Sequence, residues 1–407
     1  MMIETHNNSN EKMFRVLFII KNSALNRKMN TGIENLAWGL AEKGMAIYIV
    51  SGGSKPKDHN YKFSKNVKYF FVDKDGENPI NLVRQSVKVI EKYNINIVVG
   101  WIKNISTIAS VFYNNKIIYI ANQGEIAPSS IVYSIFRTMM KRKIGFLDGL
   151  ILIKNIKKFS KRADKIISIS KAVRDSSIKT YNLNINKCLV IPRGIDISIY
   201  KKHINKIENN YEKKRLMFAG NIQSSKGIDD LVESLKFVRS PLKLTLCGKV
   251  DTTYLEIIKN KVITVNNNSN TNHEIEYLGL LGQKELVMEY NECDFFIFPS
   301  HSEGLGKVLI EAMACGAPVI CSDIDTFKEI VKDKYNGLMF EVKSSKSLAK
   351  AINIYLNDMK MSNLYAENAR KTVVEKFSKE FEVDMWQKVI RDEIEVKQMR
   401  EAKNEHY

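Results

Sequence analysis

Short apolar runs alternate with amphipathic segments through the first part of the chain. Residues 14–20 form a continuous apolar run, which is typical of a strand buried on both faces. Apolar residues then recur at helical spacing from Ile33 to Ala41 and stop at Gly44, before another apolar run at 46–50. The alternation continues with predicted strands at 67–72, 97–101 and 117–121 and predicted helices at 81–93 and 106–113. Strands that alternate with helices predict a parallel, doubly wound sheet.

The alternation pauses and then begins again in the second part of the chain. Two further strands are predicted at residues 165–169 and 188–191, and a polar stretch follows them. Beyond it, strands are predicted at 216–219, 242–247, 275–278, 295–299 and 318–321, and helices at 227–238, 254–261, 283–291, 307–314 and 348–356. The charged segment 363–403 is also predicted to be helical.

This restart predicts two Rossmann-like α/β domains. We expect the first to span residues 1–197 and the second 215–379, joined by a linker at 198–214, with a helix at 380–407 packing back on the first domain. A chain of 407 residues exceeds what one hydrophobic core usually organises. Its 44% hydrophobic and 27% charged content is ordinary for a folded protein.

The composition argues against export and against a membrane span. Residues 1–12 are polar, and the longest apolar runs, 14–20 and 144–153, are too short to cross a bilayer. We therefore expect a cytoplasmic protein. The five cysteines are odd in number and none has the spacing of zinc ligands, so we expect buried free thiols.

The net charge of +18 suits an anionic partner, either nucleic acid or a membrane surface, or it serves only solubility. Its densest block is the segment 137–165, with ten Lys or Arg against two Asp. Apolar residues in this block recur at spacings compatible with one helical face, so a basic amphipathic helix is predicted. Contact with an anionic membrane surface and packing on its own domain both remain open. No aromatic-basic motif or helix-turn-helix pattern accompanies the charge, so nucleic acid is not an expected partner.

In doubly wound sheets, ligands bind beyond the carboxyl ends of the strands. The predicted strand 216–219 is followed by Gly220 and Asn221, and Lys226 then precedes a helix. Backbone N–H groups at a helix start favour a phosphate, and a lysine adds a full positive charge. The pattern is common at helix starts, so alone it identifies little.

A second loop follows the predicted strand 295–299. It contains Glu303, Gly304 and Gly306, and Glu311 lies on the next helix. The glycines let the backbone approach a ligand closely, and the helix start presents N–H donors to a diphosphate. Such a loop can hold the phosphates and ribose of a nucleotide together. The alternative is that Glu303 complements the helix dipole and the glycines are ordinary turn residues.

Residues 294–340 as a block resemble the group-1, glycogen-synthase-like retaining glycosyltransferases of the GT-B superfamily, whose E-x7-E pair is matched by Glu303 and Glu311. The resemblance extends over nearly the whole chain. Its further segments are residues 30–51, 163–175, 190–196, 218–234 and 276–294.

This resemblance implies two Rossmann-like domains facing each other across a cleft. The C-terminal domain is expected to bind a UDP- or GDP-linked hexose or N-acetylhexosamine, and the N-terminal domain a glycan or lipid-linked acceptor. Lys226 is expected at the diphosphate, Glu311 at the ribose hydroxyls and Glu303 beside the transferred sugar. The other expected donor-binding residues are Gly220, Asn221, Gly304, Leu305 and Gly306, and those expected on the acceptor or phosphate side are Gly32, Asn122, Gln123 and Arg193.

The chain departs from the family pattern at two places. The family usually has Arg at the position of Asn221, so one of two expected phosphate cations is missing, and Arg193 or Lys249 are candidates to replace it. Many members also place a histidine at the end of the fourth strand of the first domain, whereas this chain has none from Tyr119 to Glu125.

Positioned cations and N–H dipoles can replace a divalent metal in stabilising a leaving diphosphate. The chain lacks an obvious D-x-D motif after a strand, so we expect a metal-independent enzyme with no cofactor besides the donor. A leaving phosphate that guides the acceptor to the same face is favoured over a covalent Glu303 intermediate. Bacterial surface polysaccharide synthesis on the inner face of the membrane is the working hypothesis. The alternatives are an epimerase or phosphorylase of the same fold and a non-catalytic glycan-binding scaffold subunit.

Overall fold

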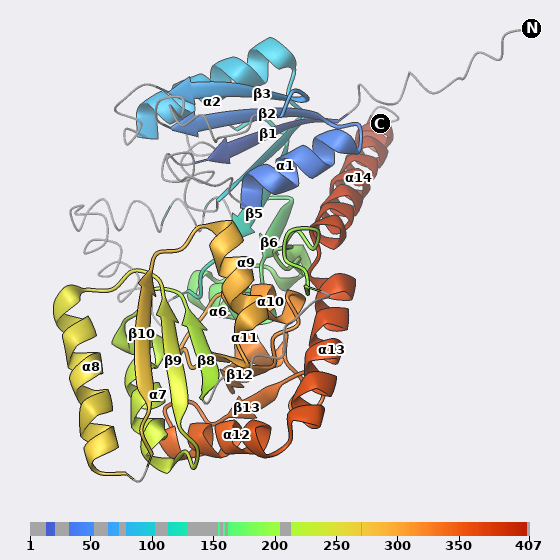
Figure 1. Ribbon diagram of the computed structural model, residues 1–407. Helices are drawn as coiled ribbons and strands as arrows, with labels where there is room; N and C mark the ends of the chain where they lie inside the picture. Colours follow the sequence, from blue (N-terminus) through green and yellow to red (C-terminus); the bar gives the residue numbers. More distant parts are fainter. Residues whose placement is uncertain are drawn as a thin grey trace, which may run out of the picture. The chain divides into compact units, whose positions relative to one another are not determined.

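The computed structural model describes residues 14–20, 32–52, 64–72, 79–101, 113–127, 154, 158, 162–203, 213–269 and 271–404 (Figure 1). These residues form two compact units. Unit 1 contains the described residues up to Arg193 together with those from Lys379 onward, and unit 2 spans Gly194–Ser378. The prediction of two doubly wound α/β domains is confirmed.

Unit 1 is built on a parallel sheet with helices on both faces. Among the described residues, its strand order is β3-β2-β1-β4-β5-β6-β7. The strands are β1 (Arg15–Ile20), β2 (Ala46–Gly52), β3 (Val67–Val72), β4 (Ile97–Trp101), β5 (Ile118–Gln123), β6 (Lys165–Ser168) and β7 (Cys188–Val190). The helices are α1 (Gly32–Glu42), α2 (Pro79–Tyr93), α6 (Lys171–Tyr181) and α14 (Lys379–Asn404).

Two apolar clusters cover the two faces of this sheet. On one face, α1 contacts β2 and β3 and packs against α14, and Leu40 and Trp386 lie in this cluster. Gly39 lets these helices approach, because a Cβ there would lie 2.4 Å from Val383 Cγ2. On the other face, α2 packs through Leu82 and Ile90. Burial on both faces explains why β1, β2 and β4 are largely apolar.

Unit 2 repeats the architecture with its own sheet, in the order β10-β9-β8-β11-β12-β13. Its strands are β8 (Lys214–Ala219), β9 (Leu242–Cys247), β10 (Glu274–Gly279), β11 (Phe295–Phe298), β12 (Val319–Ser322) and β13 (Leu338–Phe340). Its helices are α7 (Ile228–Ser234), α8 (Thr252–Asn267), α9 (Gln283–Glu292), α10 (Lys307–Ala314), α11 (Asp325–Lys328), α12 (Ser345–Asn357) and α13 (Met359–Lys376). Helix α7 contacts α8 and α12, whereas α10 contacts α9 and α13.

Two predictions about connections need correction. The predicted helix 363–403 is two helices, α13 and α14, because the chain turns at Phe377, whose carbonyl accepts a hydrogen bond from the backbone N–H of Ile195. The predicted linker 198–214 begins too early. Tyr200 is only 2% exposed and lies within unit 2, since burial of its aromatic ring ties this segment to the core.

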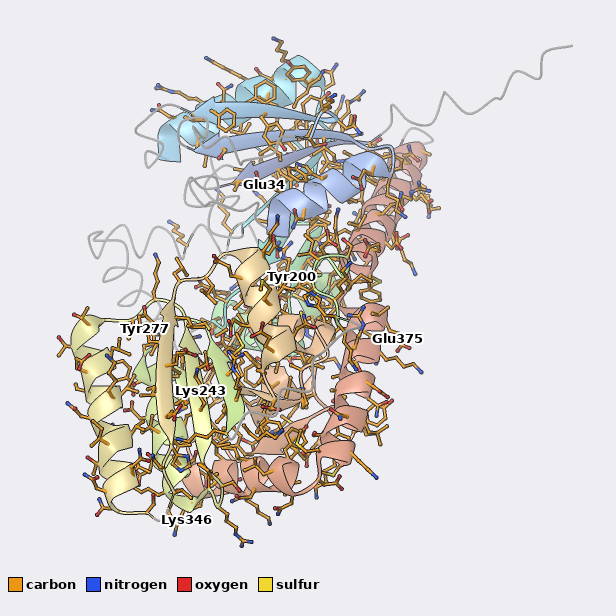
Figure 2. The ribbon with its side chains drawn as sticks, viewed as in Figure 1. Glu34, Tyr200, Lys243, Tyr277, Lys346 and Glu375 are labelled. Carbon is orange, nitrogen blue, oxygen red and sulfur yellow. The ribbon has the colours of Figure 1, made fainter. Side chains whose placement is uncertain are left out.

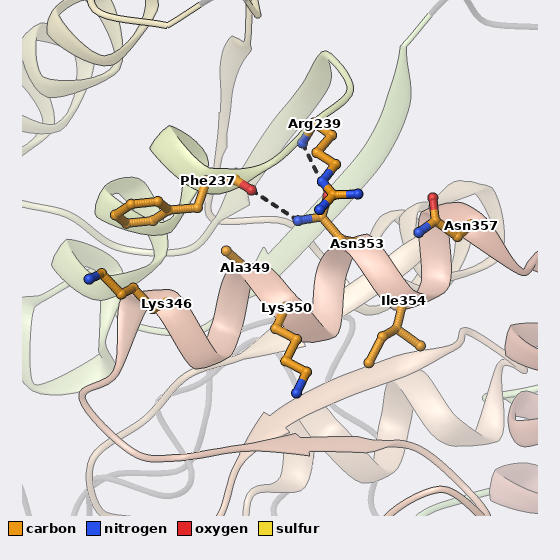
Figure 3. Close-up of a pocket in the computed structure, with 8 residues that line it drawn as sticks. All are labelled: Phe237, Arg239, Lys346, Ala349, Lys350, Asn353, Ile354 and Asn357. Atoms are coloured by element: carbon orange, nitrogen blue, oxygen red, sulfur yellow. Dashed lines mark hydrogen bonds between the residues drawn. The ribbon is translucent and has the colours of Figure 1, made fainter.

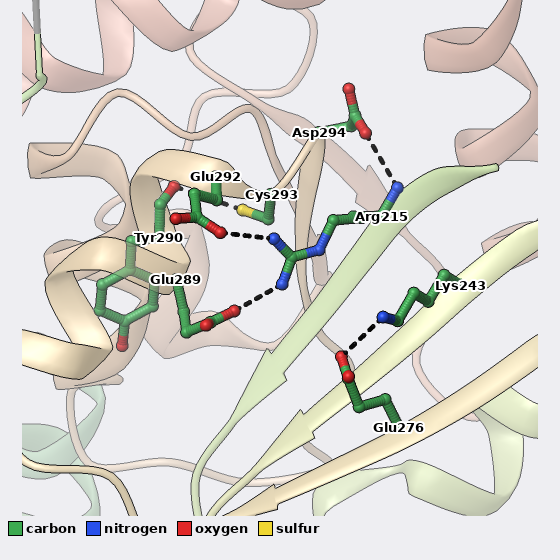
Figure 4. A network of polar contacts seen from close by, with 8 residues as sticks. All are labelled: Arg215, Lys243, Glu276, Glu289, Tyr290, Glu292, Cys293 and Asp294. Atoms are coloured by element: carbon green, nitrogen blue, oxygen red, sulfur yellow. Dashed lines mark hydrogen bonds and ion pairs between the residues drawn. The ribbon is translucent and has the colours of Figure 1, made fainter. Parts of the chain in front are cut away.

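A polar network holds α9 against β8 (Figure 4). The Arg215 guanidinium binds two carboxylates of α9, with Nη2 2.6 Å from Glu289 Oε2 and Nη1 2.8 Å from Glu292 Oε2. Its backbone N–H donates to Asp294 Oδ2 at 2.9 Å. Figure 4 shows the ring of Tyr290 on the same helix pointing away from the guanidinium. The network therefore fixes the orientation in which α9 presents Tyr290.

The cysteines match their prediction, since all five are buried and none forms a disulfide. Among the described residues, no helix is both long and apolar enough to cross a membrane. Most of the basic segment 137–165 and the predicted helix 106–113 lie outside the described residues. The predicted amphipathic helix therefore stays a prediction.

Candidate active site

The middle of the unit 2 sheet is a topological switch point. Strands β8 and β11 are neighbours, yet the chain runs from β8 outward to β9 and β10 and then returns to β11. The loops that follow β8 and β11 therefore diverge to opposite faces of the sheet. A crevice between such loops is the usual ligand site of an open parallel sheet.

Lys226 and Glu303 meet at this switch point. After β8 the chain forms a 3₁₀ turn, Ser224–Lys226, which ends at Lys226. Glu303 lies in the loop after β11. Lys226 Nζ is 2.5 Å from Glu303 Oε1, and the Ser300 hydroxyl donates to the same oxygen at 3.0 Å. The loop itself is held by Thr326, whose hydroxyl donates to the Glu303 carbonyl at 2.8 Å. The two loops thus present a cation and a carboxylate in direct contact.

Gly227 and His301 hold these two loops together. Gly227 has φ +71°, and a Cβ there would lie 2.0 Å from the Pro299 carbonyl oxygen, so only glycine permits this approach. The His301 backbone N–H donates to the Ser225 carbonyl at 3.2 Å, and His301 Nε2 lies 2.6 Å from Asp230 Oδ2. The distance between the loops is therefore fixed on both sides of Lys226.

Glu311 lies on α10, one turn beyond the glycine-rich loop. The residue is 3% exposed. Its Oε1 is 3.1 Å from Lys307 Nζ, and its Oε2 accepts a hydrogen bond from the Tyr290 hydroxyl at 3.2 Å. Helix α10 begins after Gly306, which has φ +85° and packs against Phe327, and Leu305 before it is buried. Gly304 completes the loop between Glu303 and this helix.

The remaining residues predicted to bind the sugar nucleotide lie where β8 ends. Gly220 has φ +141° and its N–H donates to the Cys247 carbonyl at 2.9 Å, which ties the end of β8 to that of β9. Asn221 follows it and is exposed. The Lys249 carbonyl accepts from the Ile222 N–H at 2.8 Å, and its side chain is also exposed.

Unit 1 holds the residues predicted on the acceptor or phosphate side. Arg193 Nη1 is 2.6 Å from Glu382 Oε1 of α14, and its side chain is 12% exposed. Gly32 lies against it, since a Cβ on Gly32 would be 2.8 Å from Arg193 Cδ. Arg193 therefore has an acidic partner within its own unit.

Asn122 and Gln123 end strand β5 and are buried, at 3% and 5% exposed. The Gln123 side-chain amide donates to the Glu125 carbonyl at 3.1 Å. The Asn122 side-chain oxygen has no hydrogen-bond partner within the described part of the chain. A buried acceptor of this kind suits a donor group on a ligand.

A pocket of about 330 Å³ in unit 2 lies away from these loops (Figure 3). It is lined by α12 and by Phe237 and Arg239, which precede β9 and so lie at the amino end of the sheet. Lys346 of this pocket and Tyr277 at the carboxyl end of β10 mark opposite ends of the unit (Figure 2). The pocket is therefore separate from the switch point.

Several residues that shape the site were not predicted from the sequence. Ser300 and His301 adjoin Glu303 in the motif, so their position was the only available indication. Nothing in the sequence indicated the roles of Tyr290 and Arg215, because the residues that they contact are distant along the chain.

Two doubly wound α/β units are the architecture of the GT-B class of fold. Residues 200–372 match the family described as glycosyl transferases group 1, and residues 29–199 match the family described as glycosyltransferase family 4. Residues 200–372 therefore belong to the group 1 glycosyltransferase family, and the two matches together cover residues 29–372.

Curated relatives support this assignment. An uncharacterized glycosyltransferase of Methanocaldococcus jannaschii is 32% identical over 252 residues, covering 60% of this chain and 63% of the relative. A capsular polysaccharide biosynthesis glycosyltransferase of Staphylococcus aureus is 28% identical over 237 residues, covering 53% of this chain and 58% of the relative. The chain thus spans less than two thirds of the length of the relatives that it matches.

A solved structure shares the fold. The HepE protein of Anabaena, in complex with UDP and glucose, superposes with a TM-score of 0.70 over 93% of this chain and 100% of that chain. The two sequences are 14% identical, so the likeness concerns the fold.

Proposed function

We propose that the chain transfers a hexose or N-acetylhexosamine from a nucleotide diphosphate, with UDP the first candidate, to a glycan or lipid-linked acceptor. The observation that carries this proposal is the contact of Lys226 with Glu303 at the switch point, where a doubly wound sheet binds its ligand. The buried Glu311 on the adjoining helix supports it, since a carboxylate there suits ribose hydroxyls. UDP is favoured because HepE, which shares the fold, was solved with UDP bound.

The chemical step requires charge stabilisation on the leaving group. As the bond from the sugar to the diphosphate breaks, negative charge develops on the phosphate and positive charge on the sugar ring. Lys226 and the N–H groups at the start of α10 stabilise the leaving diphosphate, which makes a divalent metal unnecessary. In this proposal Glu303, which contacts Lys226, stabilises the positive charge on the sugar.

Retention of configuration follows from the same geometry in our proposal. The departing phosphate accepts the proton of the acceptor hydroxyl and guides that hydroxyl to the face that the phosphate leaves. Glu303 then needs to form no covalent bond, because the departing phosphate itself directs the acceptor hydroxyl to that face.

The acceptor is proposed from the distribution of charge. Basic and acidic side chains are nearly balanced in residues 194–378, so almost all of the net +18 lies in unit 1. A basic acceptor-binding unit suits an anionic glycan or a lipid-linked acceptor at a membrane face. Bacterial surface polysaccharide synthesis remains our proposal for the setting, and the capsular relative supports it.

Thermal unfolding with a panel of sugar nucleotides tests the proposal. UDP-, GDP-, ADP- and CMP-sugars are added in EDTA to the wild type and to Glu311→Ala. One nucleotide class is expected to stabilise the wild type by about 2.7 kcal/mol at 100 times its Kd. Glu311→Ala should lose most of this shift because the ribose loses its acceptor.

Glu256→Ala is the matched control, since Glu256 pairs with Lys259 on α8 at 2.9 Å and lies outside the switch point. This variant should keep the full shift. If no sugar nucleotide stabilises the wild type, the transferase proposal fails and a glycan-binding scaffold subunit takes its place. A shift that requires a divalent cation would refute only the metal independence.

A further inference from the structure

Glu311 is a buried carboxylate that needs several hydrogen-bond donors. Its side chain is 4% exposed, and a carboxylate buried to this degree is costly unless it is paired and hydrogen-bonded. A carboxylate offers about four lone-pair positions. The number and direction of the donors around Glu311 therefore decide which positions remain for a ligand.

Two tyrosines approach this carboxylate from the protein interior. Tyr290 of α9 is completely buried, and its hydroxyl is 3.2 Å from Glu311 Oε2. Tyr200 is 2% exposed, and burial together with the charge of the nearby Glu311 carboxylate raises the pKa of its hydroxyl. The Gln283 side-chain amide, 3.4 Å away, donates to the Tyr200 oxygen, so the Tyr200 proton is not used in this contact.

Burial raises the pKa of Tyr200 and of Tyr290, and the negative charge of Glu311 raises both further. Both phenols therefore remain protonated at neutral pH. Tyr290 therefore keeps the proton that it donates to the carboxylate, and Tyr200 keeps a proton that it can donate.

Lys307 contacts the other oxygen of the carboxylate. Its side chain is 52% exposed, and its Nζ is 3.1 Å from Glu311 Oε1. An exposed lysine can leave its partner at little cost. The side of the carboxylate that faces Lys307 is thus the one that a ligand can reach, whereas the interior side is occupied by the phenols.

The two tyrosines come from a rigid frame. Helix α9 is fixed to β8 by Arg215, as described above. The segment containing Tyr200 is fixed to α9 in turn, because Asn291 donates to the Lys201 carbonyl at 3.1 Å and accepts from the His203 N–H at 2.7 Å. The phenols are therefore held in place independently of Glu311.

We propose that Tyr200 and Tyr290 are positioning residues that hold the Glu311 carboxylate from behind, so that its outward lone pairs accept the ribose hydroxyls of the donor nucleotide. This inference rests on the proposed function. It adds that selection for an intact ribose depends on two phenols that do not themselves touch the nucleotide.

The test compares UDP with 2′,3′-dideoxyuridine diphosphate, which lacks both ribose hydroxyls. Calorimetric Kd values are measured for the wild type, Tyr200→Phe, Tyr290→Phe and the double variant. The wild type should prefer UDP by about 10- to 100-fold, the range expected for hydrogen bonds to a charged group. Each single variant should lower the ratio of the two Kd values by about five-fold. The Kd of the dideoxy analogue should change little.

Tyr355→Phe is the matched control. Tyr355 is also completely buried in unit 2, but its hydroxyl donates to the Val319 carbonyl at 3.1 Å. This variant should lose stability and keep the full preference for UDP. Circular dichroism and the thermal midpoint show whether each variant is folded.

Three outcomes separate the inference from the function beneath it. A preference for UDP that is unchanged in the Phe variants, or an equal loss of affinity for both nucleotides, overturns the positioning role. A wild type that binds UDP and its dideoxy analogue equally also overturns it and leaves donor binding intact. If the wild type binds neither and the sugar-nucleotide panel shows no stabilisation, the proposed function itself fails. If the panel identifies another base, the comparison is made with that base.

Discussion

Lys226→Ala is expected to lower donor turnover by about 100- to 1,000-fold, the usual effect of removing one positioned group that stabilises developing charge. Lys226 lies in the loop after β8 and contacts Glu303 in the loop after β11. Asn221, in the same loop as Lys226, carries no charge. The leaving diphosphate therefore loses its cation on the β8 side. The measurement is the release of nucleotide from the sugar nucleotide at saturating donor, with water accepting the sugar.

Lys236→Ala is the matched control for this variant. Lys236 also pairs with a glutamate, at 2.6 Å from Glu233, but it lies in the turn after α7 rather than at the switch point. It should retain wild-type turnover. If Lys226→Ala and Lys236→Ala release nucleotide at similar rates, Lys226 has no part in the chemical step.

Gly248→Ala is expected to lower the free energy of unfolding of unit 2 by about 4 kcal/mol, from backbone strain and overlap together. Gly248 has φ +141°, and a Cβ there would lie 1.8 Å from the Gly220 carbonyl oxygen. Its N–H donates to the Gly279 carbonyl at 2.7 Å. The ends of β8, β9 and β10 therefore meet at this residue, and a side chain would force them apart. Urea unfolding followed by circular dichroism measures the loss.

Gly279→Ala separates strain from overlap. Gly279 has φ +74°, but a Cβ there would meet nothing within 4 Å. It should therefore cost only the backbone strain, about 1 kcal/mol. If both variants lose the same free energy of unfolding, overlap with the Gly220 carbonyl does not contribute to the effect of Gly248→Ala.

The strands and helices with continuous or periodic apolar residues were predicted well. Strands β4 and β9 and helix α10 have the bounds that the sequence predicts, 97–101, 242–247 and 307–314. Each is buried almost throughout, so its pattern is set by the core. Strand β13, which has only three residues, was not predicted. Helix α6 was missed because its buried side includes Ser177 and Thr180, which form no apolar stripe.

The candidate site was predictable in its parts but not in its assembly. The sequence indicates that Lys226 and Glu303 each follow a strand, yet their contact depends on β8 lying next to β11. Strand order is set by tertiary packing, and apolar periodicity does not encode it. For the same reason Tyr200 resembled a linker residue, since its burial beside Glu311 depends on α9 and α10.

The most direct test of the central claim is a calorimetric comparison of UDP with uridine in EDTA, for the wild type and for Lys226→Ala. The account predicts that the wild type binds UDP about 100-fold more tightly than uridine, because the diphosphate gains charge-assisted hydrogen bonds. Lys226→Ala should remove most of that difference and leave uridine binding unchanged. Equal binding of UDP and uridine by the wild type, or an undiminished difference in Lys226→Ala, would contradict a donor diphosphate at the switch point of unit 2.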